Sequence, residues 1–524
     1  MLSLTKFRLF IIICSLITAI PSLSGNEKIS PPSFNIRTER AVDAVDLNVG
    51  PQLFIDNYLI AEWENIKKIT HAPQRVSDKP ILGWQQGTTQ PYVTVVRDTQ
   101  TGKFRLWYNK FLGKEASIAY AESTDGIHWE LPSLGILGDD NRLFRISSSF
   151  QSGYGISLID EGPDFPDKSR RFKITWWGQT KPWAQESPQG GGDPGMRIAF
   201  SNDGIHWTPY PGNPVLSDYS EPWFVGDPRR PYGTSDIIDV YWDPLRSRYG
   251  VFLKTPAIPA DGLTTGQKAG LFIRRLVSAS FSKDFIHWAK PYRVIVPEPR
   301  DAGQLEFYGA GGVICRGPLL IGFIRMLHDD YPAEPHGPKE GIGYATLVTS
   351  RDGKHWERHD DIFFDRSSQP YAWDRAMTWI GSVIPVEDEF YIYYGGYRSG
   401  HKIKPTRQRQ LGLAKIKRDR FVSRDASGNQ KGRLMTVPVR VPAPDKQLIL
   451  NANAAGGKIR LRLLDPDTNQ PLPGYDYDNC EPISADGLML PVCWQDKTTI
   501  PAGVYRIEFE IYQAGIFGFD LASL

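Results

Sequence analysis

The sequence predicts an all-β protein, built as a five-bladed β-propeller followed by a small C-terminal β-sandwich. The first observation is composition: the chain has 49 glycines and 41 prolines, and aromatic residues make up 12 % of it. The second observation is that long apolar stretches with a helical period are missing, which favours many short strands joined by turns. The third observation is a motif whose aspartates recur at spacings of 78, 81, 68 and 67 residues. Repetition at such a period indicates a repeat architecture.

The first 24 residues predict a signal peptide. Lys6 and Arg8 form a basic start, residues 9–20 an apolar run, and residues 22–25 a small-residue end. The apolar run is too short to cross a membrane comfortably, so the pattern favours export, with a retained N-terminal anchor as the alternative. We therefore expect the mature protein, 25–524, to be secreted or periplasmic and to have no further membrane segment.

The charge balance limits the class of partner. The formal net charge of the whole chain is +2, and the mature chain is near neutral once the basic residues of the signal are removed. A nucleic-acid partner requires a basic face on the protein, so we expect no such partner.

Three cysteines remain once Cys14 leaves with the signal. Cys480 and Cys493 are close enough in sequence to form a disulfide in an exported protein, and free thiols are the equal alternative. Cys315 lies in an apolar run, which predicts a buried free thiol.

The recurring motif has the form Ser-x-Asp-Gly-x-His-Trp, with Phe285 in place of the glycine in the third copy. Its aspartate can accept hydrogen bonds from downstream backbone N–H groups, and its glycine tolerates the positive φ of a tight turn. Its tryptophan offers a large apolar surface to insert between neighbouring blades. We interpret the motif as scaffold and its histidines as parts of the turn, not as metal ligands. The copies are residues 123–129, 201–207, 282–288 and 350–356, with a degraded fifth copy at 418–421.

Each copy follows a set of predicted strands rich in aromatic and β-branched residues. Three such strands before each turn and one after it make a four-stranded blade, and radial repetition of blades makes a propeller over residues 50–422. Residues 53–60 are predicted to be a strand that enters or closes the ring. After a polar linker at 423–432 the pattern becomes short alternating strands, so residues 434–524 are predicted to form a β-sandwich.

Three acidic residues stand at the start of the first strand of blades three, four and five. In a propeller this strand lines the central channel, and its start faces the funnel where ligands bind. Glycoside hydrolysis needs one carboxylic acid and one carboxylate, about 5–5.5 Å apart for retention or about 6.5–9.5 Å apart for inversion. A third carboxylate can raise the pKa of the acid by repulsion. We therefore predict Asp236, Glu306 and Asp374 as catalytic residues, the alternative being that they bond Arg375, backbone N–H groups or a central water.

Aromatic and polar residues near these positions are predicted to bind the sugar. Asp56 is a secondary candidate if its strand is innermost, and strand alternation predicts that Asp239 packs between blades. The loop residues Asp329, Asp330 and His336 could line the mouth or bind a cation. No cofactor is predicted. A structural Ca²⁺ is possible, although the spacing of the residues does not require one. The predicted substrate-binding residues are Trp84, Gln90, Trp177, Tyr308, His328, Trp373, Arg375 and His401.

These repeats and the closing segment 411–423 resemble exported proteins grouped with the glycoside hydrolase family 32/43-like five-bladed propellers. The resemblance covers roughly residues 50–520, including the sandwich. It implies a glycosidase or a related sugar-binding protein. Families 32 and 43 carry their acids on the first three blades, whereas the acids here fall on blades three to five, so no individual role is carried over.

The leading hypothesis is therefore an exported glycoside hydrolase that cleaves a polysaccharide or oligosaccharide. A sialidase-like enzyme is one alternative, because the sialidase turn is only one residue longer than this motif. Sialidases resemble six-bladed propellers with three arginines and a tyrosine nucleophile, so five repeats weigh against this alternative. A non-catalytic carbohydrate-binding propeller is the other alternative. Such a protein would keep the aromatic residues and would lose nothing if the carboxylates were neutralised.

Overall fold

The computed structural model describes residues 43–84, 88–112, 115–147, 152–179, 195–217, 237–257, 274–296, 298, 301, 305–401, 403, 409–426 and 428–523. The predicted signal peptide and Asp236 lie outside these residues. The regular secondary structure of these residues is almost entirely β-strand, with short 3₁₀ turns at η2 (Leu47–Val49) and η4 (Lys168–Arg170), so the all-β prediction is confirmed. Over the same residues, no helix has the length and apolar character needed to cross a membrane.

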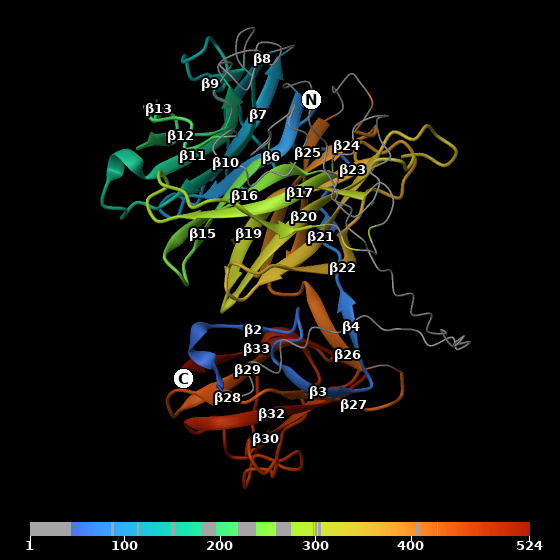
Figure 1. Ribbon diagram of the computed structural model, residues 1–524. Coiled ribbons are helices and arrows are strands. Elements are labelled where there is room, and N and C mark those ends of the chain that lie inside the picture. The colour runs from blue at the N-terminus through green and yellow to red at the C-terminus, as the bar shows by residue number, and fades with distance from the viewer. Residues whose placement is uncertain are drawn as a thin grey trace, which may run out of the picture. The chain divides into compact units, whose positions relative to one another are not determined.

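Three antiparallel sheets follow one another in the first half of the chain (Figure 1). Sheet 1 has the order β6 (Thr88–Arg97), β7 (Phe104–Leu112), β8 (Glu115–Ser123), β9 (Arg142–Ser147). Sheet 2 contains β10 (Ser152–Asp160), β11 (Phe172–Gln179) and β12 (Gly195–Ser201), the last paired with both β13 (Thr208–Pro209) and β14 (Leu216–Ser217). Sheet 3 has the order β15 (Ile238–Asp243), β16 (Arg248–Ala257), β17 (Arg274–Ser282), β18 (Tyr292–Ile295).

Sheets 4 and 5 repeat this pattern and are joined by one parallel pair, Gly343 with Met377. Sheet 4 consists of β19 (Leu305–Arg316), β20 (Leu319–His328), β21 (Ile342–Ser350) and β22 (Glu357–Phe364). Sheet 5 consists of β23 (Met377–Val386), β24 (Glu389–Tyr397), β25 (Arg409–Lys417) and, from far upstream, β5 (Gln74–Arg75). A segment that precedes sheet 1 in the sequence thus supplies the outer strand of sheet 5.

Clusters of the hydrophobic core join each of these sheets to its neighbours, and a further cluster brings together Tyr92, Ile237, Tyr308 and Trp379 from around the cycle. Sheets 1 and 2, 2 and 3, 3 and 4, and 4 and 5 each share one cluster. Sheet 5 in turn shares a cluster with sheet 1, in which Tyr391 stacks on Phe104. The contacts therefore run in a closed cycle. Alternating apolar side chains on strands of this kind bury both faces of each sheet.

The repeated motif forms a tight turn after the third strand of each sheet. In the first copy the Asp125 carboxylate accepts hydrogen bonds from the N–H groups of Ile127 and His128, both at 2.8 Å. Its second oxygen contacts Nδ1 of His128 at 2.7 Å. Gly126 has a φ of +74°, which only glycine adopts freely. The histidine is thus part of the turn.

Each turn packs against the sheet before it in the cycle. The degraded fifth copy keeps this role, because Arg316 of sheet 4 binds the Asp419 carboxylate with Nε at 2.6 Å, and Phe421 packs on Phe323. The other contacts, in sequence order, are Tyr393 Oη to the Gly126 carbonyl at 3.0 Å, Trp107 Nε1 to the Gly204 carbonyl at 2.8 Å, the ring of Phe200 to that of Phe285, and Arg248 to the Asp352 carbonyl.

The remaining strands form two six-stranded sheets, which we call the C-terminal sheets (Figure 1). Each contains strands from the beginning and from the end of the described residues. One contains β1 (Val45–Asp46), β28 (Val439–Val441), β32 (Gly503–Tyr512), β27 (Gly432–Thr436), β3 (Ile60–Glu64) and β30 (Lys458–Leu464). The other contains β31 (Asp486–Pro491), β29 (Lys446–Asn453), β33 (Gly515–Ser523), β26 (Val422–Ala426), β4 (Ile66–Thr70) and β2 (Gln52–Leu53).

This pairing corrects the expectation that residues 53–60 enter or close the ring. Strand β3 pairs with β27, β2 pairs with β33, and the short strand β5 pairs with sheet 5 instead. The physical reason is burial: Phe54 and Leu59 are fully enclosed in the core between the two C-terminal sheets, where Phe54 meets Phe509 edge to face.

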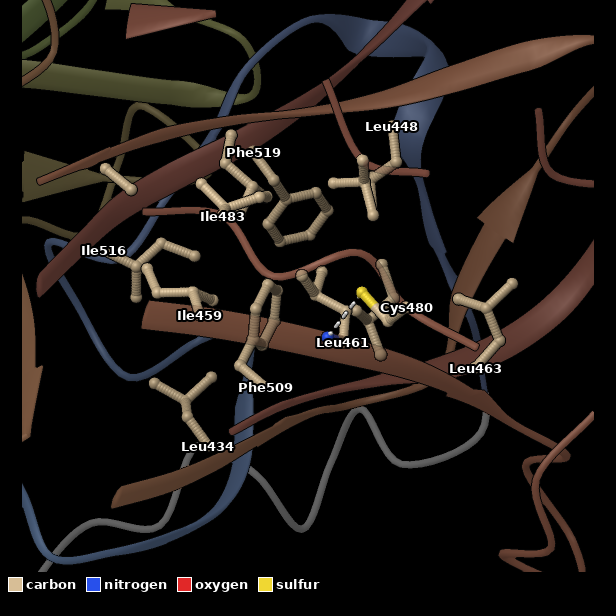
Figure 2. Packing of buried hydrophobic residues seen from close by; sticks show 14 of the residues in the cluster. Leu434, Leu448, Ile459, Leu461, Leu463, Cys480, Ile483, Phe509, Ile516 and Phe519 are labelled. Carbon is tan, nitrogen blue, oxygen red and sulfur yellow. Dashed lines mark hydrogen bonds between the residues drawn. The ribbon is translucent and has the colours of Figure 1, made fainter. Parts of the chain in front are cut away.

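The core between the two C-terminal sheets contains one of the cysteines (Figure 2). Cys480 packs among leucine and isoleucine side chains, and its sulfur accepts a hydrogen bond from the Leu461 N–H at 3.3 Å. Cys480 and Cys493 are both free, so the disulfide alternative is not the one the structure adopts. Cys315 is also free, but half-buried where the sequence predicted full burial.

Candidate functional site

The candidate site lies where β19 of sheet 4 begins, beside β16 and β17 of sheet 3. Glu306 and Tyr308 are two residues apart on β19, so strand alternation places them on the face opposite Phe307. Phe307 is fully buried in the cluster between sheets 3 and 4. The register of β19 against β20 shifts between Phe307 and Ala310, which marks a bulge. Bulges re-aim side chains at such positions.

Glu306 is held by an arginine in an almost fully enclosed environment. Its exposed fraction is 1 %, and Nη1 of Arg275 donates a charge-assisted hydrogen bond to its Oε2. The same guanidinium lies 4.9 Å from the centre of the Tyr308 ring. A buried carboxylate needs a partner of opposite charge, and Arg275 supplies that partner here.

Tyr308 joins the cations of sheet 3 to residues of sheet 5. The ammonium of Lys254, itself buried, lies 4.2 Å from the centre of its ring. The indole of Trp379 stacks on the ring at 4.7 Å with an interplanar angle of 18°. Nε2 of His401 contacts the phenol oxygen at 3.0 Å. Two cations near an aromatic face interact favourably with its quadrupole. We refer to Lys254, Arg275, Glu306, Tyr308 and His401 as the Glu306 cluster.

A buried ion pair lies next to this cluster and connects several sheets. Arg325 extends from β20 to the Asp239 carboxylate of sheet 3, with Nη1–Oδ2 and Nη2–Oδ1 distances of 2.7 and 2.9 Å. Its Nε donates to the Ile380 carbonyl of sheet 5, and its guanidinium faces the ring of Tyr92 of sheet 1 at 5.1 Å. A Cβ at Gly311 would lie 2.5 Å from Asp239, so glycine is needed there. Asp239 therefore lies between sheets 3 and 4, in agreement with the packing that strand alternation predicts.

Asp374 is held by a different arginine in a different cluster. Nε of Arg75, on the closing strand β5, donates to its Oδ2 at 2.6 Å, and the Tyr394 phenol donates to the same oxygen at 3.1 Å. Arg75 also donates to the Asp365 carbonyl. The ring of Trp373 stacks on Tyr394. These contacts tie Asp374 and Trp373 to strands β5 and β24 of sheet 5 and not to the Glu306 cluster.

Other predicted sugar-binding residues are distributed around several sheets. Of the eight, Tyr308 and His401 lie in the Glu306 cluster. Trp84 is half exposed, with its backbone N–H 3.4 Å from Gln410, and Gln90 is nearly buried on β6. Trp177 is buried and stacks on Tyr154 of the same sheet.

Arg375 and His328 lie on the loops of sheets 4 and 5. Arg375 pairs with Glu334 at 3.2 Å, whereas Glu306 and Asp374, the two predicted acids that the structure describes, are paired with Arg275 and Arg75. His328 stacks on Tyr331 with ring centres 4.2 Å apart.

The secondary candidates do not form a metal centre. Asp56 binds Arg351 of the fourth turn with both carboxylate oxygens, at 2.9 and 3.0 Å, so it does not reach the channel. Asp330 lies 3.5 Å from His328, and His336 adopts a positive φ in the same loop. Across the described ranges, no group of three or more His, Cys, Asp or Glu side chains could hold a metal ion.

Sequence reasoning did not identify Lys254, Arg275 and Arg325. A usable signal exists for two of them, because Lys254 ends the apolar run 251–253 and Arg325 interrupts the apolar run 319–327. A basic residue inside a strand that is otherwise apolar predicts a buried cation, and a buried cation requires an anionic or aromatic partner.

The solved structures that are similar to this protein share little sequence with it, and their TM-scores are below 0.5. No family model and no curated protein matches the sequence. Among solved structures, the protein is similar to BT0996 in an RGII complex (16 % identity, covering 66 % of this protein and 92 % of that one, TM-score 0.45). It is also similar to an N-acetylgalactosamine deacetylase from F. plautii bound to blood group B trisaccharide (14 %, 68 % and 97 %, 0.42) and to a glycosyl hydrolase from Bacteroides ovatus (13 %, 67 % and 95 %, 0.41). At these TM-scores the function must be argued from the site itself.

Proposed function

We propose that the protein is an exported glycoside hydrolase, a five-bladed β-propeller with a C-terminal β-sandwich, whose active site is the Glu306 cluster. The observation that carries this proposal is a carboxylate at the start of a first strand, enclosed with an arginine, a tyrosine and a histidine. The closed cycle of sheets supports the propeller, because such a cycle brings the starts of all first strands to one face. A carboxylate next to aromatic and hydrogen-bonding groups suits a sugar ligand.

The roles within the site follow from charge. Arg275 stabilises the negative charge of Glu306, which suits Glu306 to act as the base or the nucleophile. The second carboxylate is then assigned to Asp236, whose position at the start of the first strand of sheet 3 is a sequence prediction. Asp374 keeps a structural role, because Arg75 and Tyr394 bind it. His401 and Tyr308 offer hydrogen bonds to sugar hydroxyls.

A non-catalytic carbohydrate-binding propeller is the second candidate. The observation that favours it is that, of the predicted acids among the described residues, only Glu306 belongs to the cluster, whereas Asp374 is bound elsewhere. A binding protein needs the aromatic and polar groups but no second carboxylate.

The test is hydrolysis of a polysaccharide panel, measured as release of reducing sugar, by the wild type and three single variants. Glu306→Gln and Asp236→Asn are expected to lose at least about 100-fold in kcat/KM, the usual effect of removing a catalytic acid or base. Asp374→Asn is expected to lose thermal stability while the folded protein stays within a few-fold of the wild-type kcat/KM. Full activity of Glu306→Gln would refute the site, and glycan binding without hydrolysis by the wild type would establish the second candidate.

A further inference from the structure

Two tyrosine rings are exposed on neighbouring loops of sheets 4 and 5. Tyr331 lies in the loop 329–341 between β20 and β21, and Tyr371 lies in the loop 365–376 between β22 and β23. Their exposed fractions are 48 % and 70 %. Scattered exposed apolar residues need no explanation, but aromatic rings gathered beside a candidate site are typical of ligand-binding surfaces.

Tyr331 is fixed next to the Glu306 cluster by stacking and by two backbone hydrogen bonds. Its ring lies parallel to His328, the last residue of β20, with an interplanar angle of 10°. His328 pairs across the sheet with Leu305, the residue before Glu306. The Gly341 N–H donates to the Tyr331 carbonyl at 3.0 Å, and the His401 N–H donates to the Gly341 carbonyl at 3.3 Å. The Tyr331 loop is therefore bonded to the loop of His401, and the Tyr331 ring stacks on a residue that pairs with the strand of Glu306.

Tyr371 is held in an unfavourable backbone conformation by a charged frame. Its φ is +60°, a region that a bulky residue occupies only at a cost of roughly 1–3 kcal/mol. Its N–H donates to Oε1 of Glu334 at 2.8 Å, and the other oxygen of Glu334 binds Nε of Arg375 at 3.2 Å. Glu334 belongs to the same loop as Tyr331, so this bond ties the two loops together. The guanidinium of Arg398 lies 6.0 Å from the ring centre.

The combination of strain and exposure indicates a function. A strained residue that buries its ring can recover the cost by packing, but Tyr371 leaves most of its ring in solvent. Strain of this kind persists where the surrounding structure imposes it, and it gathers at ligand-binding sites. Tyrosine also provides a large rigid contact area at little entropic cost, together with a hydroxyl for hydrogen bonding.

We propose that Tyr331 and Tyr371 form an outer subsite that stacks on a sugar residue beyond the one held at the Glu306 cluster. The C–H face of a sugar ring fits an exposed aromatic face, and His328 and Arg398 are placed to bind its hydroxyls. The substrate is then a chain of several sugar residues, not a single sugar or a disaccharide. This inference rests on the proposed function, because it concerns the same site.

The experiment compares Tyr331→Ala and Tyr371→Ala with the wild type and a matched control, Tyr292→Ala. Tyr292 is also a partly exposed tyrosine, but its hydroxyl binds the Lys354 carbonyl of the fourth turn, which follows the opposite end of β21 from the Tyr331 loop. The probes are the purified oligosaccharides of two to six residues from whichever panel polysaccharide the wild type cleaves or binds. The readouts are kcat/KM for each length and the dissociation constant from calorimetry.

Each tyrosine variant is expected to lose about tenfold in kcat/KM on the longest oligosaccharides and less than twofold on the disaccharide. The control should match the wild type at every length. Equal losses at all lengths, or none at any length, would overturn the outer subsite while leaving the proposed function standing. A wild type that neither cleaves nor binds any glycan would overturn both.

Discussion

Replacing Arg325 by methionine should destabilise the ring of sheets strongly while preserving side-chain volume. Arg325 is completely buried and makes three hydrogen bonds, two to Asp239 and one to the Ile380 carbonyl. The variant leaves the Asp239 carboxylate buried without its counter-ion. Removal of one partner from a buried ion pair costs about 3–5 kcal/mol in free energy of unfolding.

The double variant Arg325→Met, Asp239→Leu separates the pair from the packing around it. Because an apolar pair of similar volume leaves no buried charge, this variant should recover at least half of the loss. Burial raises the pKa of Asp239 in the wild type, against the opposing effect of Arg325. Removal of the arginine should raise this pKa further, so the single variant should lose more stability than the wild type as the pH rises above about 4. An acid with a raised folded pKa stabilises the protein only while it is protonated.

The assay is guanidinium unfolding followed by tryptophan fluorescence, at pH 5 and pH 7, for the wild type and both variants. A loss under about 1 kcal/mol for Arg325→Met would refute the assignment of a buried, charge-bearing pair. So would a double variant as unstable as the single one, because the loss would then come from packing and not from an unpaired carboxylate.

Two further outcomes follow from other parts of the fold. Burial and the nearby Lys68 ammonium lower the pKa of His359 to about 3. As the pH falls, the unfolded protein therefore binds a proton at this histidine before the folded protein does, and the free energy of unfolding should fall by about 1–2 kcal/mol between pH 6.5 and 5. Denaturation measured over this pH range should show a smaller fall for His359→Gln. Gly126→Ala and Gly102→Ala both replace a glycine with φ above +70°, but only the former places a Cβ 2.6 Å from Tyr393. Thermal unfolding should show roughly 1 kcal/mol lost at Gly102 and at least twice that at Gly126, and equal losses would contradict docking of the turn on sheet 5.

The repeats were predictable because each is local in sequence. The turn motif needs only seven consecutive residues, so its copies reveal the number and spacing of the third strands without any knowledge of the fold. The N-terminal strands were not predictable in the same way. Strand β3 is five residues long and its partner β27 lies about 370 positions away, and no local pattern encodes that pairing.

The residues of the candidate site also differ in how far a local pattern predicts their contacts. Comparing the starts of first strands selected Glu306, which shares Arg275 with Tyr308, and Tyr308 in turn contacts His401. The role of Glu306 in a sugar site stays a prediction. The same comparison selected Asp374, but its partner Arg75 is 299 residues away in sequence. Strand alternation predicts which side of a strand a residue faces. It does not predict which distant cation will pair with a carboxylate on that side.

The pairing of the two ends of the protein has a consequence for how it is assembled. Arg424 donates hydrogen bonds to the backbone of residues 54 and 56, and strand β26 pairs with β4. Strands β2, β3 and β4 are therefore synthesised long before their partners β33, β27 and β26, and they stay unpaired until those partners have been made. Contacts of such large sequence separation slow folding, because the entropy of closing the loop is lost before the contacts form. Deleting residues 434–524 would leave β2 and β3 as unpaired edges prone to aggregation, and would not release a self-sufficient ring.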